Sequence, residues 1–309
     1  MALSSEATVM RSTGSWYEVL ADDGRILPCR VRGRLRLRGS RTTNPVAVGD
    51  RVVYEIDEKG ECTIVDVLPR SNYIIRRASN LSKESHIIAA NIDRAVLLAT
   101  LFQPVTSYEF IDRFLVTAEA YGVPTCIVLG KYDLARERPE ELEAFLSVYR
   151  GAGYRVIPVS AVDGTGIAQI KELFAEGTTL LAGHSGVGKS TLVASVEPGL
   201  TLRTGEVSKA SHKGQHTTTF SQMYLLSGGG RLIDTPGIKG FGLLEIAPQE
   251  LCRYFPDMAR VAPDCAFTNC THTHEPSCAV IEAVEQGRIA WQRYESYLKM
   301  LDDDGKYRR

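Results

Sequence analysis

The sequence predicts a multidomain protein with an N-terminal OB-like β-barrel, a central α/β domain and a small C-terminal helical domain. Short apolar runs separated by turn residues fill residues 8–72, as in small barrels. Strand-like and helix-like patterns alternate after Asp93, as in parallel α/β sheets. A cysteine–histidine cluster near the C-terminus lies between two helical patterns. We therefore expect domains at 1–72, 73–245 and 246–309.

Composition narrows the class of protein. The 309 residues are 44% hydrophobic, which is typical of folded cores, and the net charge of −1 excludes a polycation. The first residues have no basic-then-apolar layout, and no apolar run approaches the length of a membrane span. Seven cysteines, an odd number, favour a metal site in a reducing compartment over a disulfide framework. We expect a cytoplasmic protein with no membrane partner.

The predicted barrel contains a row of arginines. Residues 29–38 read Cys-Arg-Val-Arg-Gly-Arg-Leu-Arg-Leu-Arg, with an arginine at every second position. Alternate side chains of a strand point to opposite faces, so one strand would display all five guanidinium groups on one side. A plain solvent-facing strand is the alternative, but five like charges favour an anionic partner. The predicted RNA-binding residues are Arg30, Arg32, Arg34, Arg36 and Arg38.

A phosphate-binding loop organises the central domain. An apolar strand ending near Ala182 is followed by Gly-x-x-x-x-Gly-Lys-Ser and by a helix that we expect to start at Thr191. Glycines let successive N–H groups face one phosphate chain, and the helix N-terminus adds positive potential. Lys189 is expected to contact the β- and γ-phosphates, and Ser190 to bind Mg²⁺. The predicted loop residues are Gly183, His184, Ser185, Gly186, Val187, Gly188, Lys189, Ser190 and Thr191.

Two earlier strands end in segments that resemble the guanine-reading loops of GTPases. The strand 124–129 precedes Gly130-Lys131-Tyr132-Asp133, similar to Asn-Lys-x-Asp, and the strand 154–159 precedes Ser160-Ala161. An ionised Asp133 accepts both donors of the guanine edge, the Lys131 stem can cover the ring, and the Ala161 N–H can meet O6. Ligands of α/β domains bind at the carboxyl ends of strands, which supports this interpretation.

The order of these motifs is unusual, because the base-reading loops precede the phosphate loop. No Lys-x-Asp follows Asp234-Thr-Pro-Gly237, so either residues 130–133 are an accident or the domain is circularly permuted. A permuted GTPase behind a β-barrel and before a Cys/His cluster resembles the RsgA family of GTPases that depend on the small ribosomal subunit. Residues 213–219 (Lys-Gly-Gln-His-Thr-Thr-Thr) and 234–238 also match this family. The resemblance covers nearly the whole chain.

The resemblance implies Mg²⁺-dependent hydrolysis of GTP to GDP and phosphate, stimulated by the small ribosomal subunit late in its maturation. The partners it implies are that subunit, its rRNA and GTP or GDP, and we expect a monomer. Two departures from the family pattern stand out. Gly130 replaces the asparagine of Asn-Lys-x-Asp and so lacks a side-chain amide that would brace the phosphate loop, and Gln215 replaces a basic residue.

The switch segments carry the remaining site residues. Asp234 is expected to hold Mg²⁺ through water, and the Gly237 N–H to sense the γ-phosphate. One of Thr217, Thr218 and Thr219 should bind Mg²⁺; the sequence does not separate them, and Thr218 is taken as the ligand. Ile238 stands where small GTPases have a water-orienting Gln, and the resemblance implies that His216 takes that role beside Lys189.

The C-terminal cluster offers three thiols and two imidazoles within fourteen residues. Three sulfurs and one nitrogen make a closed tetrahedral Zn²⁺ site, which is a structural one. Spacing alone does not separate His272 from His274. The family's Cys-x4-Cys-x-His-x5-Cys pattern implies Cys265, Cys270, His272 and Cys278 as ligands of one zinc. Segments 248–260 and 279–301 are predicted to be helices around it.

Two other functions remain open from the sequence. One is a nucleic-acid-binding module whose phosphate loop is structural or does not hydrolyse its nucleotide. The other is a P-loop kinase, which would need an acceptor pocket and a lid that the sequence does not reveal. Loss of Lys189 separates an enzyme, which would lose phosphate release, from a passive binder, which never had turnover.

Overall fold

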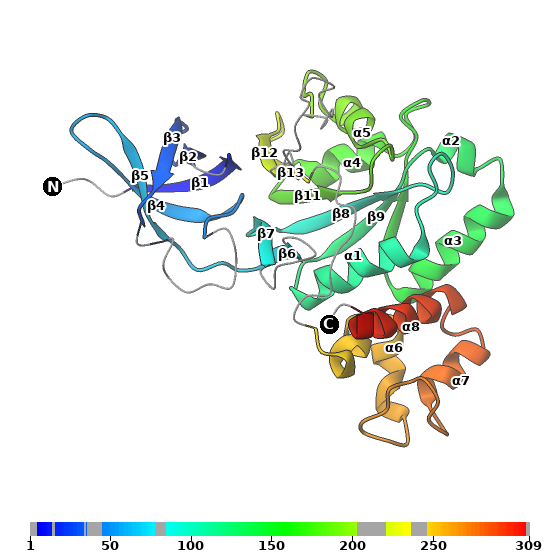
Figure 1. Ribbon diagram of the computed structural model, residues 1–309. Coiled ribbons are helices and arrows are strands. Elements are labelled where there is room, and N and C mark those ends of the chain that lie inside the picture. The colour runs from blue at the N-terminus through cyan, green and yellow to red at the C-terminus, as the bar shows by residue number, and fades with distance from the viewer. Residues whose placement is uncertain are drawn as a thin grey trace, which may run out of the picture.

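The structure is a computed structural model that describes residues 5–13, 16–33, 35, 45–77, 85–202, 221–235 and 246–306. Figure 1 shows a β-barrel at one end, a sheet flanked by helices in the middle, and a group of helices below the sheet. No helix in these ranges is both long enough and apolar enough to cross a membrane.

Five strands form the N-terminal barrel. They run in the order β1-β2-β3-β5-β4, and an antiparallel pairing of β1 with β4 closes the ring. Alternate residues such as Val9, Val19 and Ile64 fill the interior and are fully buried, as the period of a strand requires. The predicted OB-like barrel is therefore confirmed. The strands are β1 (Ser5–Ser12), β2 (Tyr17–Ala21), β3 (Ile26–Val31), β4 (Arg51–Ile56) and β5 (Cys62–Val67).

The arginine-rich segment departs from its prediction. β3 ends at Val31, and the Leu35 N–H donates to the Arg32 carbonyl oxygen at 3.0 Å, which makes a tight turn. Glycine at position 33 weakens strand structure at this point. An unbroken strand over residues 29–38 is therefore wrong. Arg34, Arg36 and Arg38 lie outside the described residues.

Two of the scattered cysteines also differ from expectation. Cys29 and Cys62 are direct neighbours in the parallel pairing of β3 with β5, with Cα atoms 4.6 Å apart, and they form a disulfide. Both are buried in the barrel core. The two cysteines are 33 residues apart in the sequence, so their pairing could not be predicted without the order of the strands.

The central sheet continues from the barrel. β8, β9, β10, β11 and β13 are parallel in the order β10-β9-β8-β11-β13, and β12 pairs antiparallel to β13. One pair of residues, Arg11 and Gln222, joins β12 to β1 of the barrel. The strands are β8 (Arg94–Ala99), β9 (Thr125–Leu129), β10 (Arg155–Pro158), β11 (Thr178–Ala182), β12 (Gln222–Leu225) and β13 (Arg231–Asp234). A separate hairpin pairs β6 (Tyr73–Arg77) with β7 (Ser85–Ala90).

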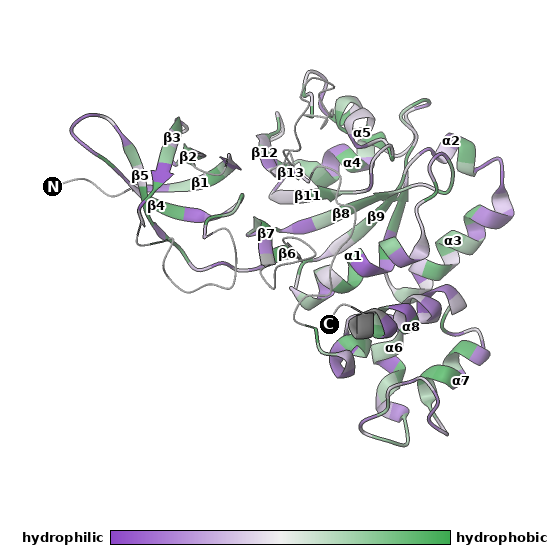
Figure 2. Ribbon diagram, in the orientation of Figure 1, coloured by the Kyte–Doolittle hydropathy of each residue, from purple (hydrophilic) through white to green (hydrophobic). Residues whose placement is uncertain are grey.

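Helices cover both faces of this sheet. Successive strand residues enter different cores: Leu97 packs with α1 and α3 residues, while Leu98 packs with α4 and α5 residues. Figure 2 shows the resulting hydrophobic strands in the middle of the sheet. The predicted α/β domain is thus confirmed, although its helix after the phosphate loop begins two residues early. The helices are α1 (Tyr108–Ala120), α2 (Tyr132–Ala135), α3 (Pro139–Ala152), α4 (Ile167–Phe174) and α5 (Lys189–Val196).

The C-terminal domain is helical, but its helices are shorter than predicted. The segment 248–260 divides at Phe255, because Pro256 lacks an N–H and starts a new helix. The segment 279–301 divides around Gly287, whose φ is +71°. The elements are η2 (Pro248–Tyr254) and η3 (Ala262–Asp264), both 3-10 helices, with α6 (Pro256–Val261), α7 (Ala279–Glu285) and α8 (Trp291–Lys306).

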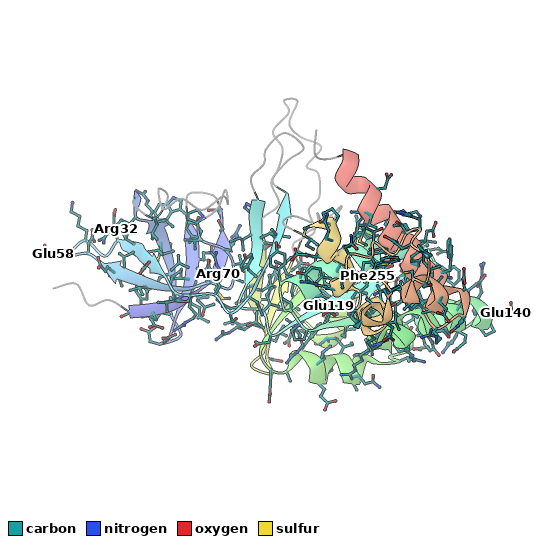
Figure 3. All side chains as sticks on the ribbon, turned by 90° about the horizontal axis from the view of Figure 1, so that it is seen from below. Arg32, Glu58, Arg70, Glu119, Glu140 and Phe255 are labelled. Carbon is teal, nitrogen blue, oxygen red and sulfur yellow. A yellow bond between two sulfur atoms is a disulfide. The ribbon has the colours of Figure 1, made fainter. Side chains whose placement is uncertain are left out.

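A buried arginine joins this domain to the sheet domain. Arg293 of α8 donates two hydrogen bonds to Asp257 of α6, at 3.1 and 2.9 Å, and one to Asp112 of α1, at 2.6 Å. The Arg293 and Asp112 side chains are fully buried, and the guanidinium carbon lies 4.6 Å from the ring centre of Phe255, which Figure 3 labels. Arg293 thus links α8 and α6 to α1.

Candidate nucleotide and metal sites

The predicted nucleotide loops share one edge of the sheet. Parallel strands end on the same side, so the segments after β9, β10, β11 and β13 lie along one edge. These are the positions of residues 130–133, 160–161, 183–188 and 235. The strands that precede the phosphate loop in sequence pair beside its strand in space, since β8 lies between β9 and β11. The sequence order is therefore permuted, while the spatial arrangement is that of a nucleotide-binding α/β domain.

The phosphate loop has the backbone that its glycines predict. Gly183, Gly186 and Gly188 have φ values of +151°, +80° and +103°. Residues with a side chain rarely adopt these backbone conformations. A Cβ on Gly183 would also lie 2.8 Å from the Leu98 carbonyl oxygen. Lys189 Nζ donates to the carbonyl oxygens of Gly183 and His184, so it lies inside the loop. Burial lowers the pKa of Lys189, and the Asp234 carboxylate acts against that shift.

Asp234 ends β13 opposite Leu181 of β11, next to the phosphate loop. Thr235 holds this end of the strand, because its hydroxyl donates to the Leu181 carbonyl oxygen at 3.0 Å. Asp234 is buried, and its Oδ1 has no hydrogen-bond partner among the described residues. Burial raises its pKa to about 6, and Lys189 partly offsets this. A buried carboxylate oxygen without a partner suits the hydrated Mg²⁺ that phosphate loops bind.

The two predicted base-reading loops contact each other. The Ser160 hydroxyl donates to Asp133 Oδ1 at 2.8 Å, and Ser160 is fully buried. The Tyr132 N–H donates to the Val159 carbonyl oxygen at 3.1 Å, which ties the two loops at the backbone. Lys131 has a left-handed backbone, with φ +52°. Asp133 is thus oriented by its neighbouring strand, as a carboxylate that reads a base must be.

Three predicted residues of the nucleotide site lie outside the described residues, namely His216, Thr218 and Gly237. The same holds for the other threonines of that switch, Thr217 and Thr219. The roles of all five residues stay predictions. Ser190 and Thr191 lie in the first turn of α5, after the glycine at its N-terminal end. Ala161 directly follows the buried Ser160.

The predicted zinc ligands come together in the C-terminal domain. The donor atoms of Cys265, Cys270, His272 and Cys278 all lie within 4.8 Å of one another. Cys265 Sγ lies 3.6 Å from His272 Nδ1 and 3.9 Å from Cys278 Sγ. A tetrahedral zinc with ordinary bond lengths holds sulfur and nitrogen donors about 3.5–3.8 Å apart. Three thiols and one imidazole at this spacing are compatible with a structural zinc.

Neighbouring groups select His272 rather than His274. Tyr294 of α8 donates to the His272 carbonyl oxygen at 2.7 Å, and Tyr297 donates to the Thr271 carbonyl oxygen at 2.9 Å. His272 is 5% exposed, and burial lowers its pKa, which favours the neutral imidazole that binds metal. His274 is exposed, and its Nδ1 lies 2.8 Å from the Thr273 hydroxyl.

This geometry predicts different results for the two histidines. His272→Ala should weaken zinc binding by more than about 100-fold, since even outer-shell changes cost 10- to 100-fold. His274→Ala is the matched control and should retain stoichiometric zinc. Metal analysis of the purified proteins after dialysis against a weak chelator measures both. Loss of zinc from His274→Ala with retention by His272→Ala would reverse the ligand assignment.

Some residues at the site escape sequence reasoning. Thr106, between β8 and α1, lies 2.7 Å from the His184 side chain, and the carbonyl oxygen of Gln103 accepts from Lys131. On the barrel, the Arg30 guanidinium lies 4.3 Å from the ring centre of Trp16. Of these residues, Thr106, Gln103 and Trp16 belong to no motif. An exposed tryptophan beside a run of arginines was the one available signal.

A phosphate loop, a carboxylate-bearing base loop and a buried aspartate on one edge of a parallel sheet define a P-loop GTPase, with its motifs circularly permuted. Family models match the chain over residues 67–244, described as RsgA GTPase, and over residues 6–64, described as RsgA N-terminal domain. The chain belongs to the RsgA family of GTPases, which are hydrolases acting on GTP.

Individual relatives agree with this assignment. The chain is 51% identical to small ribosomal subunit biogenesis GTPase RsgA 2 of Bacteroides thetaiotaomicron, over 97% of this chain and 98% of the relative. It is 52% identical to the RsgA protein of Porphyromonas gingivalis, over 98% of each. The solved structure of YjeQ from Thermotoga maritima superposes with a TM-score of 0.78 at 34% identity, covering 97% of this chain and 98% of that one. YloQ, titled a circularly permuted GTPase, superposes at 0.71 with 28% identity, covering 97% and 95%.

Proposed function

We propose that this chain hydrolyses GTP on the small ribosomal subunit late in the subunit's maturation, and that the subunit stimulates the reaction. One observation carries the nucleotide assignment: the Asp133–Ser160 pair and the phosphate loop share the edge of the sheet around β8. The names of the relatives, small ribosomal subunit biogenesis GTPases, support the role at the ribosome. A factor with this partner acts in the cytoplasm, and we propose that it does so as a monomer.

The residues divide the work on GTP as follows. Asp133 accepts from the guanine edge, with Lys131, Ser160 and Ala161 beside the base, and Lys189 and the loop N–H groups bind the phosphates. Ser190, a switch threonine, Thr218, and Asp234 would hold Mg²⁺. Mg²⁺ supplies charge to the phosphate oxygens. His216 orients the attacking water.

The barrel and the C-terminal domain form the proposed contacts with rRNA. Arg30 is exposed on β3, and its stacking on Trp16 places a cation and an aromatic surface together, a combination that suits nucleic acid. Arg32 is half exposed and bonds Glu55 at 2.9 Å, so phosphate would compete with that carboxylate. Figure 3 shows Arg32 at the end of the barrel away from the α/β domain. Arg34, Arg36 and Arg38 are further proposed rRNA contacts. One structural Zn²⁺ would hold the C-terminal domain.

The decisive experiment compares hydrolysis of GTP with and without purified small subunits, with ATP and large subunits as controls. We expect slow intrinsic turnover and a rise toward the roughly 10³-fold scale of partner-stimulated GTPases. Equal stimulation by large subunits would overturn the partner assignment. Competition by ATP as strong as that by GTP would overturn the base assignment. Absence of hydrolysis under all conditions would favour a nucleic-acid-binding module with a passive phosphate loop.

A further inference from the structure

Residues 101–107, in the segment between β8 and α1, lie at the centre of the nucleotide edge. β8 has β9 on one side, which leads to the base loop, and β11 on the other, which leads to the phosphate loop. The segment that follows β8 therefore emerges between the two halves of the proposed site. We call residues 101–107 the central loop. Nothing in the sequence motifs assigns it a role.

On one side, the central loop is bonded to the phosphate loop through Thr106. This residue is 5% exposed, and its Oγ1 accepts from the Thr100 N–H at 2.9 Å and lies 2.7 Å from His184 Nε2. His184 Nδ1 lies 3.1 Å from the Ser185 carbonyl oxygen. A carbonyl oxygen only accepts, so Nδ1 carries a proton, and in that tautomer Nε2 accepts from the Thr106 hydroxyl. Each donor and acceptor in this series of hydrogen bonds then has a partner.

On the other side, the central loop is bonded to the base loop. The Gln103 carbonyl oxygen accepts from Lys131 Nζ. The Arg138 guanidinium lies 4.6 Å from the ring centre of Phe102, just beyond α2. A Cβ built on Gly186 of the phosphate loop would lie 3.8 Å from Pro104. The central loop thus contacts both halves of the proposed site at once.

Position 130 explains why such a link matters in this chain. Gly130 has no amide to brace the phosphate loop, and its N–H is used by the Ala99 carbonyl oxygen at 2.8 Å. A Cβ there would lie 3.0 Å from Leu98 Cδ1, which is tighter than most such contacts. The base loop and the phosphate loop therefore need another connection if they are to hold one nucleotide between them.

We propose that Thr106 is a positioning residue for the nucleotide: through His184 it holds the phosphate loop against the central loop, which holds Lys131 of the base loop. The central loop supplies the brace that Gly130 lacks. This inference rests on the proposed nucleotide site. It concerns the affinity and residence of the nucleotide, and Thr106 itself contacts no reacting atom.

The test compares Thr106→Val with Thr106→Ser in calorimetric titrations with GDP. Valine keeps the shape but leaves the Thr100 N–H and His184 Nε2 without a partner, so GDP should bind roughly tenfold more weakly and dissociate faster. Serine keeps the hydroxyl and should restore affinity to within about twofold of the original chain. Thr117→Val is the matched control, since the hydroxyl of this buried threonine donates within α1, to the Arg113 carbonyl oxygen at 2.7 Å. It should leave GDP affinity unchanged.

A second variant separates positioning from simple stability. His184→Phe removes the same hydrogen bond from the other side and leaves the Thr100 N–H bonded. The loss in the double variant should be close to that of Thr106→Val alone, since the bond that His184→Phe removes is already absent there. Additive losses would overturn the proposal, and so would a lower unfolding midpoint for Thr106→Val with unchanged GDP affinity. If the original chain itself fails to bind GDP, the proposed nucleotide site fails instead, so the two failures are distinguishable.

Discussion

Replacement of Lys189 by alanine is expected to lower the rate of GTP hydrolysis by about 100- to 1,000-fold, the scale of losing one preorganised group that stabilises charge in the transition state. The Lys189 ammonium lies within the phosphate loop and is held by the carbonyl oxygens of Gly183 and His184. No other described lysine or arginine donates a hydrogen bond to these two oxygens. Single-turnover hydrolysis with small subunits present measures the effect.

The control for this variant is Lys171→Ala, which removes an exposed lysine of α4. Its rate should match that of the original chain, and both proteins should keep their affinity for small subunits. An unchanged rate for Lys189→Ala would remove the phosphate loop from the reaction. It would leave the chain as a binder whose nucleotide has another role.

Replacement of Arg293 by alanine is expected to lower the free energy of unfolding by about 3–5 kcal/mol, because it leaves two buried carboxylates without their counter-charge. Asp112 is fully buried, and burial raises its pKa even with Arg293 present. Asp257 is 4% exposed and loses a bidentate partner. The urea midpoint, followed by circular dichroism, measures the loss.

Two further variants identify the cause of that loss. Arg288→Ala removes an exposed arginine whose hydrogen-bond partner, Gln286, is also exposed. It should change the free energy of unfolding by no more than about 0.5 kcal/mol. A triple variant, Arg293→Met with Asp112→Leu and Asp257→Leu, should recover most of the stability, since it removes the charges together. If the triple variant is no more stable than Arg293→Ala, packing around the guanidinium is the main term and uncompensated charge is not.

The arginine matters for function because of what α1 adjoins. Asp112 lies in the first half of α1, which directly follows the central loop. The C-terminal domain is therefore bonded to the helix that begins beside the phosphate and base loops. We expect this helix to transmit the effect of contacts between the C-terminal domain and the small subunit to the nucleotide edge. The rate of GTP hydrolysis by Arg293→Met with small subunits present would measure this effect.

Local patterns predicted most of the elements, because each depends on hydrogen bonds and periods within a few residues. Short apolar runs between turn residues indicated barrel strands such as β2, β4 and β5, and the alternation of strand-like and helix-like patterns after Asp93 indicated the α/β domain. The errors have local causes too. Gly33 interrupts the predicted strand 29–38, and Gly287 interrupts the predicted helix 279–301. Pro256 divides the predicted helix 248–260. β1 and the β6–β7 hairpin were not anticipated.

The candidate site divides in the same way. The phosphate loop, the base loop and the metal cluster each occupy a short stretch, so residue type and spacing identify their chemistry before any fold is known. Thr106, Arg293 and the Cys29–Cys62 pair depend on partners 78, 181 and 33 residues away. No spacing rule relates such positions, since the tertiary packing of strands and helices decides which segments become neighbours.

By itself, the amino-acid sequence determined the three-part architecture, the order of the nucleotide motifs and the cysteine–histidine cluster, because each is carried by short stretches of contiguous residues; the choice of His272 over His274 came from the family resemblance. The tertiary structure alone decided that β8 lies between the base and phosphate loops, and that a buried guanidinium joins α8 to α1. Both features form when segments that are distant in the sequence pack against each other and bury their surfaces. A local sequence pattern does not indicate which distant segments will do so.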